Sequence, residues 1–416
     1  MKYPFPIIKN ISQILPLIKD KPEFIVAEKT GGYTVVNYVV QTSDTFPPVY
    51  GSPIIDNKEC MMVNDFGDIV IDILMHQKDM TLLRELRGCI FETATGNILH
   101  RRYHKFFNVG ERPETQLSEI DFSKPHVILE KLDGSMITPV QTTDGIRWGT
   151  KMGITEVALP VEEFVAGHPE YAKFAKACLA KGQTPIFEWC SRKQAIVIDY
   201  PEDMLVLTAM RDNVHGTYST YQELFYMGQG WKIPVVKAYA GTASSMADLV
   251  DQTRGMIGVE GFVVRFEDGH MIKVKAEDYL LKHKTKDSLS LEKNVIEILV
   301  SEKADDLKTY MDAKDLERFN KFEEDFWSGV KHTTGMLLAL RCQCRTVDRK
   351  IYAVEFVQKR NSQYSKFLYK MFDPMDNAAV FAMVKEAIAK SCSSQTKVNE
   401  VRWMFNCEWN AKPILE

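Results

Sequence analysis

The segment Lys131-Leu132-Asp133-Gly134-Ser135 combines a primary amine with a tight-turn signal. A lysine held on such a turn can act as a covalent nucleophile once its amine loses its proton. A free lysine amine has a pKa near ~10.4, so this requires nearby positive charge or desolvation. Read alone, an Asp-Gly pair is simply a turn.

A second lysine pair could supply that charge. Gly261–Phe266 and His270–Lys275 flank the turn Glu267–Gly269, which predicts a β-hairpin. Lys273 and Lys275 are two residues apart on the return strand, so both side chains leave the same face. Two adjacent amines fit a phosphate better than a hydrophobic core.

Two glutamates lie close to apolar strand sequences. Glu188 is within Phe187-Glu188-Trp189, and Glu260 precedes the first hairpin strand. A carboxylate in register with a buried face needs a partner such as a metal or a lysine. A solvent-facing Glu188 and an exposed strand start at Glu260 remain equally open from these segments alone.

The order and spacing of these segments resemble motifs I, III, IV and V of the covalent nucleotidyltransferases, which include DNA ligases, RNA ligases and mRNA capping enzymes. Ser135 and the flanking sequence resemble the RNA ligase 1 family of T-even bacteriophages more closely. The flanking matches are Leu86–Glu92, Lys105–Asn108, Thr150–Gly153, Asp278-Tyr279 and Thr285–Ser288. One position departs from the family, because Ala195 stands where an arginine is usual.

The resemblance implies a mechanism and its reactants. Lys131 would attack the α-phosphate of ATP and form lysine–AMP, AMP would pass to an RNA 5′-phosphate, and a 3′-hydroxyl would seal the strand. Mg²⁺ or Mn²⁺ would be the metal cofactor. The implied catalytic residues are Lys131, Glu188, Glu260, Lys273 and Lys275.

Further site residues follow from the resemblance. Phe107 would stack on adenine, Glu188 would bind the ribose hydroxyls, and Tyr279 would act in ligation. The implied nucleotide-binding residues are Tyr38, Arg87, Lys105, Phe107, Glu130, Gly134, Lys151, Glu188, Lys273 and Lys275. The implied metal ligands are Glu260, Asp305 and Asp306, although an acidic pair near a helix start explains the last two equally well.

The elements that must position these residues are mostly strands up to about residue 285. We expect strands at 33–40, 87–92 and 98–101, an antiparallel meander over 127–150, and strands at 185–189, 195–198 and 204–207. A short helix is expected near the N-terminus, with Ile7 and Leu15 on one face. Further helices are expected to start at Pro169 and to cover 245–254. Beyond 285 the pattern is helical, with a helix over 374–391 capped by Asp373 and one extended stretch at 350–356.

The predicted fold class is therefore α+β, with an antiparallel-sheet nucleotidyltransferase (ATP-grasp-like ligase) domain over 1–285 and a mainly helical domain over 286–416.

The composition of the chain is that of a globular protein. The chain has 416 residues, a net charge of -4 and 45% hydrophobic residues. Disorder and a transmembrane helix are excluded, because this composition is globular and no run of about 18 apolar residues occurs. Cysteine usage and the lack of a signal sequence predict reduced thiols in a cytoplasmic protein, the host cytoplasm if the gene is a phage gene.

Alternatives remain from two classes. A DNA ligase or capping enzyme would usually carry an OB-fold after motif V, whereas the sequence there is helical. A non-catalytic RNA-binding module on a ligase scaffold would not need the five intact motif residues.

The expected partner is RNA, such as single-stranded ends or a cleaved tRNA anticodon loop, with no membrane association and an undefined oligomeric state. The run from His100 to Lys105 fits either an RNA groove or a solvated loop.

Overall fold

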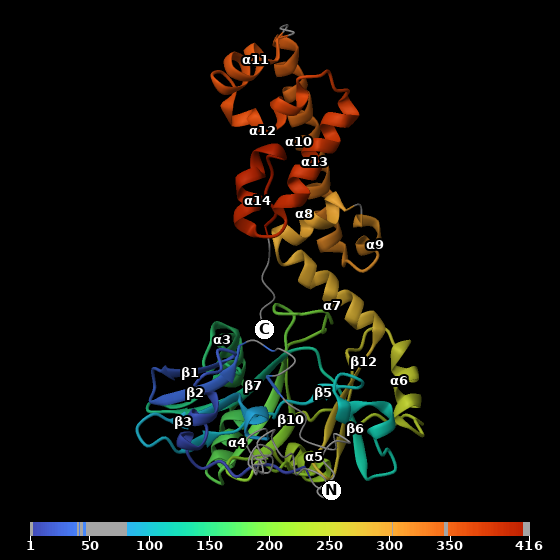
Figure 1. The fold of residues 1–416 in the computed structure, drawn as a ribbon. Coiled ribbons are helices and arrows are strands. Elements are labelled where there is room, and N and C mark those ends of the chain that lie inside the picture. The colour runs from blue at the N-terminus through green and yellow to red at the C-terminus, as the bar shows by residue number, and fades with distance from the viewer. Residues whose placement is uncertain are drawn as a thin grey trace, which may run out of the picture. The chain divides into compact units, whose positions relative to one another are not determined.

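The structure is a computed structural model that describes residues 3–39, 41, 45–46, 81–301, 303–344 and 348–410, except for the side chain of Asp306. These residues form two compact units, Met1–Leu280 and Leu281–Ile414. Figure 1 shows strands in the first unit and helices in the second. The predicted domain boundary at 285 falls inside helix α7 (Glu277–Leu289) and stays a prediction.

The described residues of the first unit form three four-stranded sheets, and all neighbouring strands are antiparallel except β5 and β12. In order, the sheets are β1 (Phe24–Lys29), β2 (Tyr33–Tyr38), β3 (Arg87–Glu92), β4 (Ile98–His100); β10 (Met204–Asp212), β9 (Gln183–Cys190), β7 (Ser135–Thr142), β8 (Gly145–Gly149); and β5 (Phe107–Asn108), β12 (Met271–Lys275), β11 (Gly261–Phe266), β6 (His126–Glu130). The predicted antiparallel α+β class is confirmed.

The β11–β12 hairpin forms as the sequence predicts. Lys275 pairs with Gly261 and Lys273 pairs with Val263, while the alternate residues Ile272 and Val274 are buried. This two-residue period leaves Lys273 and Lys275 on one face and packs the alternate residues into the core. The hairpin therefore carries two amines on a strand that is held by its opposite face.

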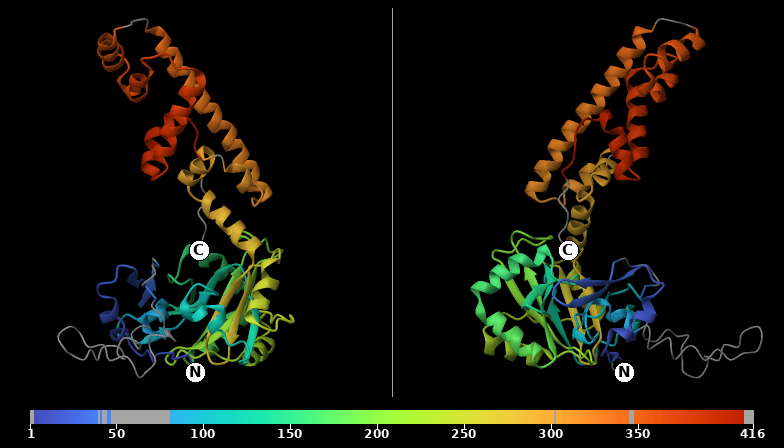
Figure 2. Two further views of the ribbon diagram at one scale, coloured as in Figure 1. Left: turned by 45° about the vertical axis from the view of Figure 1, so that its right-hand side comes forward. Right: turned by 90° about the vertical axis from the view of Figure 1, so that its left-hand side faces the viewer.

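Helices cover parts of the sheets in the first unit, as Figure 2 shows. Helix α4 (Pro169–Leu179) begins at the predicted proline, and its Tyr171 and Phe174 rings contact Phe187 of β9 at centroid distances of 5.8 and 6.3 Å. The strand that carries Glu188 is thus anchored by an aromatic core. The other helices and 3-10 turns are α1 (Leu15–Ile18), α3 (Leu159–Gly167), α5 (Tyr221–Trp231), α6 (Met246–Arg254), η1 (Ile11–Gln13), η2 (Pro113–Thr115), η3 (Leu117–Glu119) and η4 (Glu156–Ala158).

The second unit is helical, as predicted. Its core follows one face of the long helix α10 (Ala313–Gln343), where Phe319, Phe326, Val330 and Leu337 are fully buried. The remaining elements are α8 (Glu292–Val300), α9 (Ala304–Lys308), α11 (Arg349–Ile351), the π-helix η5 (Tyr352–Gln358), η6 (Ser362–Tyr364), α12 (Ser365–Leu368), η7 (Tyr369–Met371), α13 (Asn377–Ser391), α14 (Gln395–Val401) and η8 (Arg402–Met404). Within the described part of the chain, no helix is both long and apolar enough to span a membrane.

Two predictions about strand pairing are wrong. The meander over 127–150 does not form, because β6 pairs with β11 whereas β7 pairs with β8 and β9. Residues 195–198 form no strand. The backbone N–H groups of Val197 and Ile198 instead both donate to the Asp133 carboxylate.

Three helix predictions also need correction. The helix expected from Ile7 to Leu15 is replaced by η1 and the short α1, which starts at Leu15. Pro16 fits the first turn of α1, because its missing N–H would be unpaired there anyway. Residues 350–356 are helical, since their aromatic and β-branched side chains, such as Tyr352 and Phe356, fill a buried helix face. Helix α13 is capped by Asp376, which accepts from the N–H of Ala379 at 2.7 Å, and not by Asp373.

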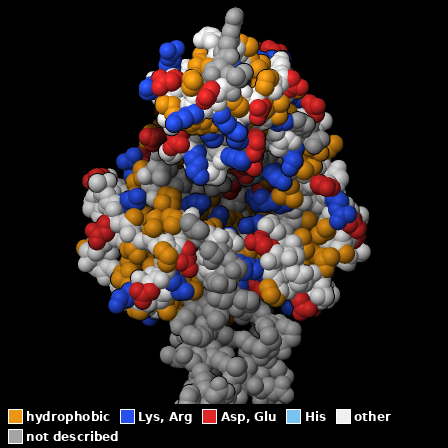
Figure 3. All heavy atoms as spheres, turned by 45° about the horizontal axis from the view of Figure 1, so that its top comes forward, with side chains coloured by type: hydrophobic (Ala, Val, Ile, Leu, Met, Phe, Trp, Pro, Cys, Tyr) orange, Lys and Arg blue, Asp and Glu red, His pale blue; other side chains and the backbone are white. Residues whose placement is uncertain are grey.

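The surface agrees with the modest net charge. On the face in Figure 3, Lys and Arg side chains are interspersed with Asp and Glu side chains and with hydrophobic ones. Charges of both signs on this face agree with the modest net charge of -4.

Candidate active site

Two lysines share one carboxylate at the centre of the predicted motif residues. The Nζ of Lys131 lies 2.7 Å from Glu260 Oε2, and the Nζ of Lys275 lies 2.9 Å from Glu260 Oε1. The lysine side chains are 22% and 24% exposed, whereas Glu260 is 3% exposed. Burial alone would raise the pKa of Glu260, but the two ammonium groups outweigh it and lower the pKa. The result is a buried anion that holds two solvent-accessible amines.

Backbone contacts fix the position of Lys131. It directly follows β6, and its N–H donates to the carbonyl of Gly261 at 2.9 Å. Gly261 has φ of 134°, and a Cβ there would lie 2.1 Å from the carbonyl oxygen of Val274. Only glycine allows this approach. The Lys131–Gly261 contact thus brings the ends of β6 and β11 together.

Glu188 belongs to the same electrostatic group. It lies on β9 opposite Met136. Burial raises its pKa to about 7, while Lys131 opposes and Glu260 reinforces this shift. A carboxyl with this pKa changes charge near neutral pH, which is typical of functional sites.

Lys273 lies among other cations. Burial and then the charges of Arg87, Lys131, Lys105 and Lys275 hold its pKa well below the usual range. Its Nζ lies 4.7 Å from the ring centroid of Phe106. Clustered cations of this kind favour binding of an anion with several charges, such as a polyphosphate.

A second group of predicted residues surrounds Tyr38. The Nζ of Lys105 lies 3.5 Å from the Tyr38 hydroxyl, and that of Lys151 lies 6.0 Å from its ring centroid. Burial would raise the pKa of Tyr38, but Arg87, Lys105 and Lys151 together lower it. The structure thus brings these four predicted residues together.

Phe107 is not open for base stacking in this structure. Its side chain is 1% exposed, and the cationic groups of Arg84, Lys105 and Arg112 lie 5.0, 5.4 and 4.8 Å from its ring centroid. Phe106, one residue earlier, is only partly buried.

Three further predicted residues have structural contacts. The N–H of Glu130 donates to the carbonyl of Lys237 at 2.9 Å. A Cβ on Gly134 would lie 2.3 Å from the Trp189 carbonyl oxygen, so the turn needs glycine. The Tyr279 hydroxyl donates to Asp133 Oδ1 at 2.8 Å.

Asp133 was not predicted as a site residue. Its motif position was visible in the sequence, but its contacts to residues 197, 198 and 279 are distant along the chain. An Asp-Gly pair whose aspartate is 2% exposed departs from an ordinary turn. What marks Asp133 as a site residue is its burial next to Lys131, and the sequence alone does not show that burial.

The predicted metal ligands Glu260, Asp305 and Asp306 belong to two different units, and their grouping stays a prediction. Among the described residues, no group of three or more His, Cys, Asp or Glu side chains is arranged to hold a metal. Asp305 lies in the second unit and is exposed, with its carboxylate 4.0 Å from Lys308 Nζ. The side chain of Asp306 lies outside the described residues. Glu260 is the predicted ligand that the first unit provides.

The basic run at 100–104 is neither an RNA groove nor a solvated loop. His100, Arg101, Arg102 and His104 are each at most 1% exposed. Arg101 donates to Glu85 at 2.9 Å and to the carbonyl of Pro6 at 2.8 Å, so the run belongs to the core. Both interpretations offered from the sequence are wrong here.

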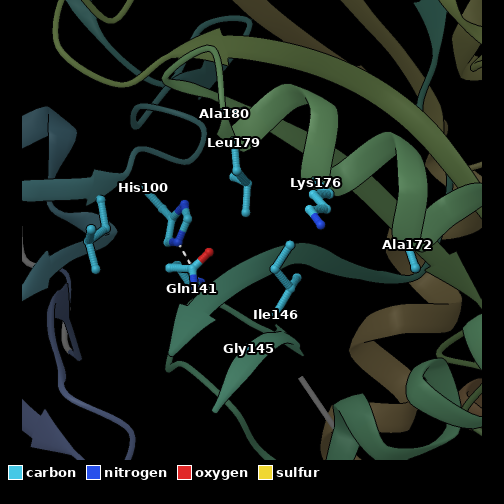
Figure 4. Close-up of a pocket in the computed structure, with 9 residues that line it drawn as sticks. His100, Gln141, Gly145, Ile146, Ala172, Lys176, Leu179 and Ala180 are labelled. Carbon is cyan, nitrogen blue, oxygen red and sulfur yellow. Dashed lines mark hydrogen bonds between the residues drawn. The ribbon is translucent and has the colours of Figure 1, made fainter. Parts of the chain in front are cut away.

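A pocket of about 620 Å³ lies elsewhere in the first unit, between β7–β8 and α4 (Figure 4). Its lining is mainly apolar, and it contains none of the predicted site residues. The lining residues are Leu99, His100, Gln141, Gly145, Ile146, Ala172, Lys176, Leu179 and Ala180. His100 accepts from the N–H of Gln141 at 2.7 Å, so this imidazole is a structural acceptor.

The sheets and the lysine–carboxylate group define a nucleotidyltransferase-type ligase scaffold. Two family models match in sequence, an RNA ligase model over residues 85–289 and a model of the T4 RNA ligase 1 C-terminal domain over residues 286–399. The chain therefore belongs to the T4 RNA ligase 1 family.

Individual relatives agree with this assignment. A provisionally named RNA ligase of Thermovibrio ammonificans is 34% identical over 49% of this chain and 54% of its own length. RNA ligase 1 of bacteriophage TS2126 is 27% identical over 44% of this chain and 47% of its own length. The chain thus spans about half the length of the curated relatives that it matches.

Solved structures of RNA ligases are also similar. A Naegleria gruberi RNA ligase variant matches with a TM-score of 0.37 and 17% identity, over 44% of this chain and 57% of that chain. An archaeal ATP-dependent RNA ligase matches with a TM-score of 0.40 and 13% identity, over 67% of this chain and 64% of that chain.

Proposed function

We propose that this protein is an ATP-dependent RNA ligase that joins 5′-phosphate and 3′-hydroxyl ends through a lysine–AMP intermediate on Lys131. The observation that carries the proposal is the accessible Lys131 amine held by Glu260 beside Lys275, in a chain of the T4 RNA ligase 1 family. A partly exposed lysine at the end of a strand, beside a second lysine, suits attack on a phosphate.

The reaction has three balanced steps. Lys131 first loses a proton to solvent, its amine attacks the α-phosphorus of ATP, and a second proton leaves the nitrogen as the P–N bond forms and the bond to pyrophosphate breaks. An oxygen of the RNA 5′-phosphate then attacks the same phosphorus, and the P–N bond breaks to give RNA-adenylate while the lysine nitrogen regains a proton from solvent. Finally the 3′-hydroxyl attacks the 5′-phosphorus, its proton passes to solvent, and AMP leaves as the phosphodiester forms.

The surrounding residues have roles that match their charges. Lys273, Lys275 and Arg87 would neutralise charge that develops on the α-phosphate. Ionised Glu188 would accept hydrogen bonds from the ribose hydroxyls.

The Tyr38 group would act further along the nucleotide. Lys105 and Lys151 lie around the Tyr38 ring and would contact the outer phosphates. Tyr279 would contribute to sealing. The remaining residues proposed for nucleotide binding are Phe107, Glu130 and Gly134.

The described carboxylates provide only part of the oxygen ligands that a divalent ion, Mg²⁺ or Mn²⁺, would need. Hard cations prefer oxygen ligands, and Mg²⁺ is commonly bound through one or two carboxylates together with substrate phosphates. Glu260 would provide such a carboxylate, with Asp305 and Asp306 proposed for a second position. When bound, the ion would supply positive charge to the phosphates.

The RNA substrate is proposed from family membership. Single-stranded RNA ends or a cleaved tRNA anticodon loop would be joined in a tRNA-repair role, and the helical second unit would contribute to that choice. Competition between a cleaved tRNA and an unstructured RNA of equal length, measured by the sealed product, distinguishes the two.

The test is covalent labelling. The protein is incubated with a divalent ion and ATP radiolabelled on the α-phosphate, then run on a denaturing gel. We expect a labelled wild-type band that is absent from Lys131→Ala and retained in Lys124→Ala, a control lysine that is 41% exposed and pairs with Asp268. An unlabelled wild-type protein, after treatment with pyrophosphate to remove bound AMP, would favour a non-catalytic RNA-binding module instead.

A further inference from the structure

The carboxylate of Glu111 is held on a tight turn at the end of β5. Its Oε2 accepts the backbone N–H of Asn108 at 2.9 Å and the side-chain amide of the same residue at 2.6 Å. The N–H of Glu111 donates to the carbonyl of Asn108 at 3.1 Å, and Gly110 within this turn has φ of 76°. Three hydrogen bonds therefore hold the carboxylate and its backbone close to Asn108.

This turn continues from the backbone beside Lys273. β5 pairs in parallel with β12, and Asn108 lies opposite Lys273 in that pairing. The N–H of Val109 also donates to the carbonyl of Lys273 at 2.9 Å. Glu111 is therefore fixed relative to the Lys273 backbone through hydrogen bonds of the sheet and the turn.

Gln41 connects the same carboxylate to Lys105. Its side-chain amide donates to Glu111 Oε1 at 3.5 Å, and its side-chain oxygen accepts from Lys105 Nζ at 2.5 Å. Glu111 is exposed, whereas Lys105 and Lys273 are only partly exposed. A solvent-accessible anion thus lies near two amines of the candidate site.

Glu111 is ionised at neutral pH. Burial alone would raise its pKa, but the two hydrogen bonds from Asn108 and then the charges of Lys105 and Lys273 lower it. The proposed function assigns Lys105 to the outer phosphates of ATP and Lys273 to the α-phosphate. Because Glu111 and a phosphate have the same sign of charge, Glu111 opposes phosphate binding at both lysines.

This opposition acts most strongly on the leaving group. Once lysine–AMP has formed, the AMP moiety is covalently bound, whereas pyrophosphate is held only by non-covalent contacts to the cations around Tyr38. Clustered cations without a nearby anion would bind pyrophosphate tightly and delay the next step. A carboxylate close to Lys105 weakens that contact.

We propose that Glu111 is an electrostatic determinant of pyrophosphate release, which weakens the binding of pyrophosphate at Lys105 and so favours the forward direction of lysine–AMP formation. This inference rests on the proposed function. Glu111 changes the affinity for the leaving group, and the attack by Lys131 itself does not involve it.

Glu111→Gln tests the proposal, because it removes the charge and keeps the shape of the side chain. Labelled lysine–AMP is incubated with pyrophosphate, and its conversion back to ATP is measured. We expect the half-saturating pyrophosphate concentration to fall about fivefold, the effect of one nearby charge in a hydrated site, and KM for ATP to fall as well. Because Glu111 is exposed, the difference from wild type should shrink between about 0.05 and about 0.5 M salt.

Glu119→Gln is the matched control. Glu119 is an exposed glutamate on η3 whose carboxylate accepts the Ser118 hydroxyl at 3.1 Å, and its variant should use pyrophosphate as the wild type does. Unchanged or weaker use of pyrophosphate by Glu111→Gln would overturn the proposal. A raised KM for ATP together with a higher requirement for the divalent ion would also overturn it, because Glu111 would then be a ligand of the ion.

Direct binding separates this inference from the ligase proposal. Calorimetry with pyrophosphate, without a divalent ion, compares Lys131→Ala with the double variant Lys131→Ala/Glu111→Gln, in which no covalent step can occur. The double variant should bind pyrophosphate about fivefold more tightly. If wild-type protein forms no lysine–AMP, the ligase proposal fails, whereas equal pyrophosphate binding by these two proteins refutes the role of Glu111.

Discussion

Two groups among the described residues of the first unit have one carboxylate that binds two cations, and the groups differ in exposure. Glu260 binds Lys131 and Lys275, which are 22% and 24% exposed. Glu85 binds Arg101 and Arg211 at 2.9 and 2.8 Å, and all three side chains are fully buried. The same charge pattern therefore occurs once at an accessible site and once in the core.

The choice of cation accounts for the difference in what each group can do. The guanidinium of Arg211 also donates to the carbonyl of Gly216, and Arg101 donates to those of Pro6 and Val214, so several backbone segments fix them. Arginine stays protonated and binds in a rigid fork, whereas lysine is a compact amine that can lose its proton. The buried group is suited to holding the fold and the accessible one to chemistry.

Removing the carboxylate of the buried group should have the largest effect. Burial alone would raise the pKa of Glu85, but Arg101 and Arg211 lower it to about 2, so it is ionised at neutral pH. Glu85→Gln leaves two buried charges without compensation and should reduce the free energy of unfolding by about 3–5 kcal/mol. Urea unfolding at pH 7 measures this.

A matched exposed pair provides the control for Glu85. Glu162→Gln breaks the ion pair with Arg147, whose side chain is 46% exposed, and should cost less than about 1 kcal/mol. Protein that remains folded in Glu85→Gln should still form lysine–AMP at low temperature. Equal losses of unfolding free energy in Glu85→Gln and Glu162→Gln would contradict the distinction between a buried and an exposed ion pair.

Replacing Glu260, the carboxylate of the accessible group, by glutamine should affect activity strongly and stability little. Glu260→Gln should reduce lysine–AMP formation about 100-fold or more, because a charge that organises the amines is lost. The free energy of unfolding should change by about 1 kcal/mol, because both lysines can be hydrated. Labelling rates and urea unfolding on the same preparation check both parts, and a large loss of stability with normal labelling would reverse the interpretation.

The sequence predicted the accessible group but not the buried one. Lys273 and Lys275 could be placed on one face because a strand has a period of two, and the motif order located Lys131, Glu188 and Glu260. The basic run at 100–104 was misread because its partner Glu85 lies on an earlier segment, and a linear pattern contains no information about such pairing.

Other errors have the same physical origin. Residues 195–198 resemble a strand in composition, but the Asp133 carboxylate binds their N–H groups instead of a neighbouring strand. Residues 350–356 contain β-branched and aromatic side chains that suit a buried helix face equally well. Local preference is decided by tertiary partners in both cases.

A smaller effect on stability than that of Glu85→Gln is expected from the pH dependence of Glu188. Its pKa is raised to about 7 in the folded protein by burial, against about 4.5 for an ordinary glutamate. The folded state therefore binds the extra proton between these values, so the stability that protonated Glu188 contributes is present below about pH 4.5 and is lost as pH rises through 7.

Glu188→Gln should remove this dependence. We expect the free energy of unfolding of the wild type to fall by about 2 kcal/mol relative to Glu188→Gln between pH 5 and 8, a figure reduced for partial hydration of the carboxyl. Urea unfolding of both proteins across this range measures the difference. Parallel pH profiles would show that Glu188 ionises as an ordinary carboxylate, and the accessible group would then contain two permanent anions rather than one anion and one titrating carboxyl.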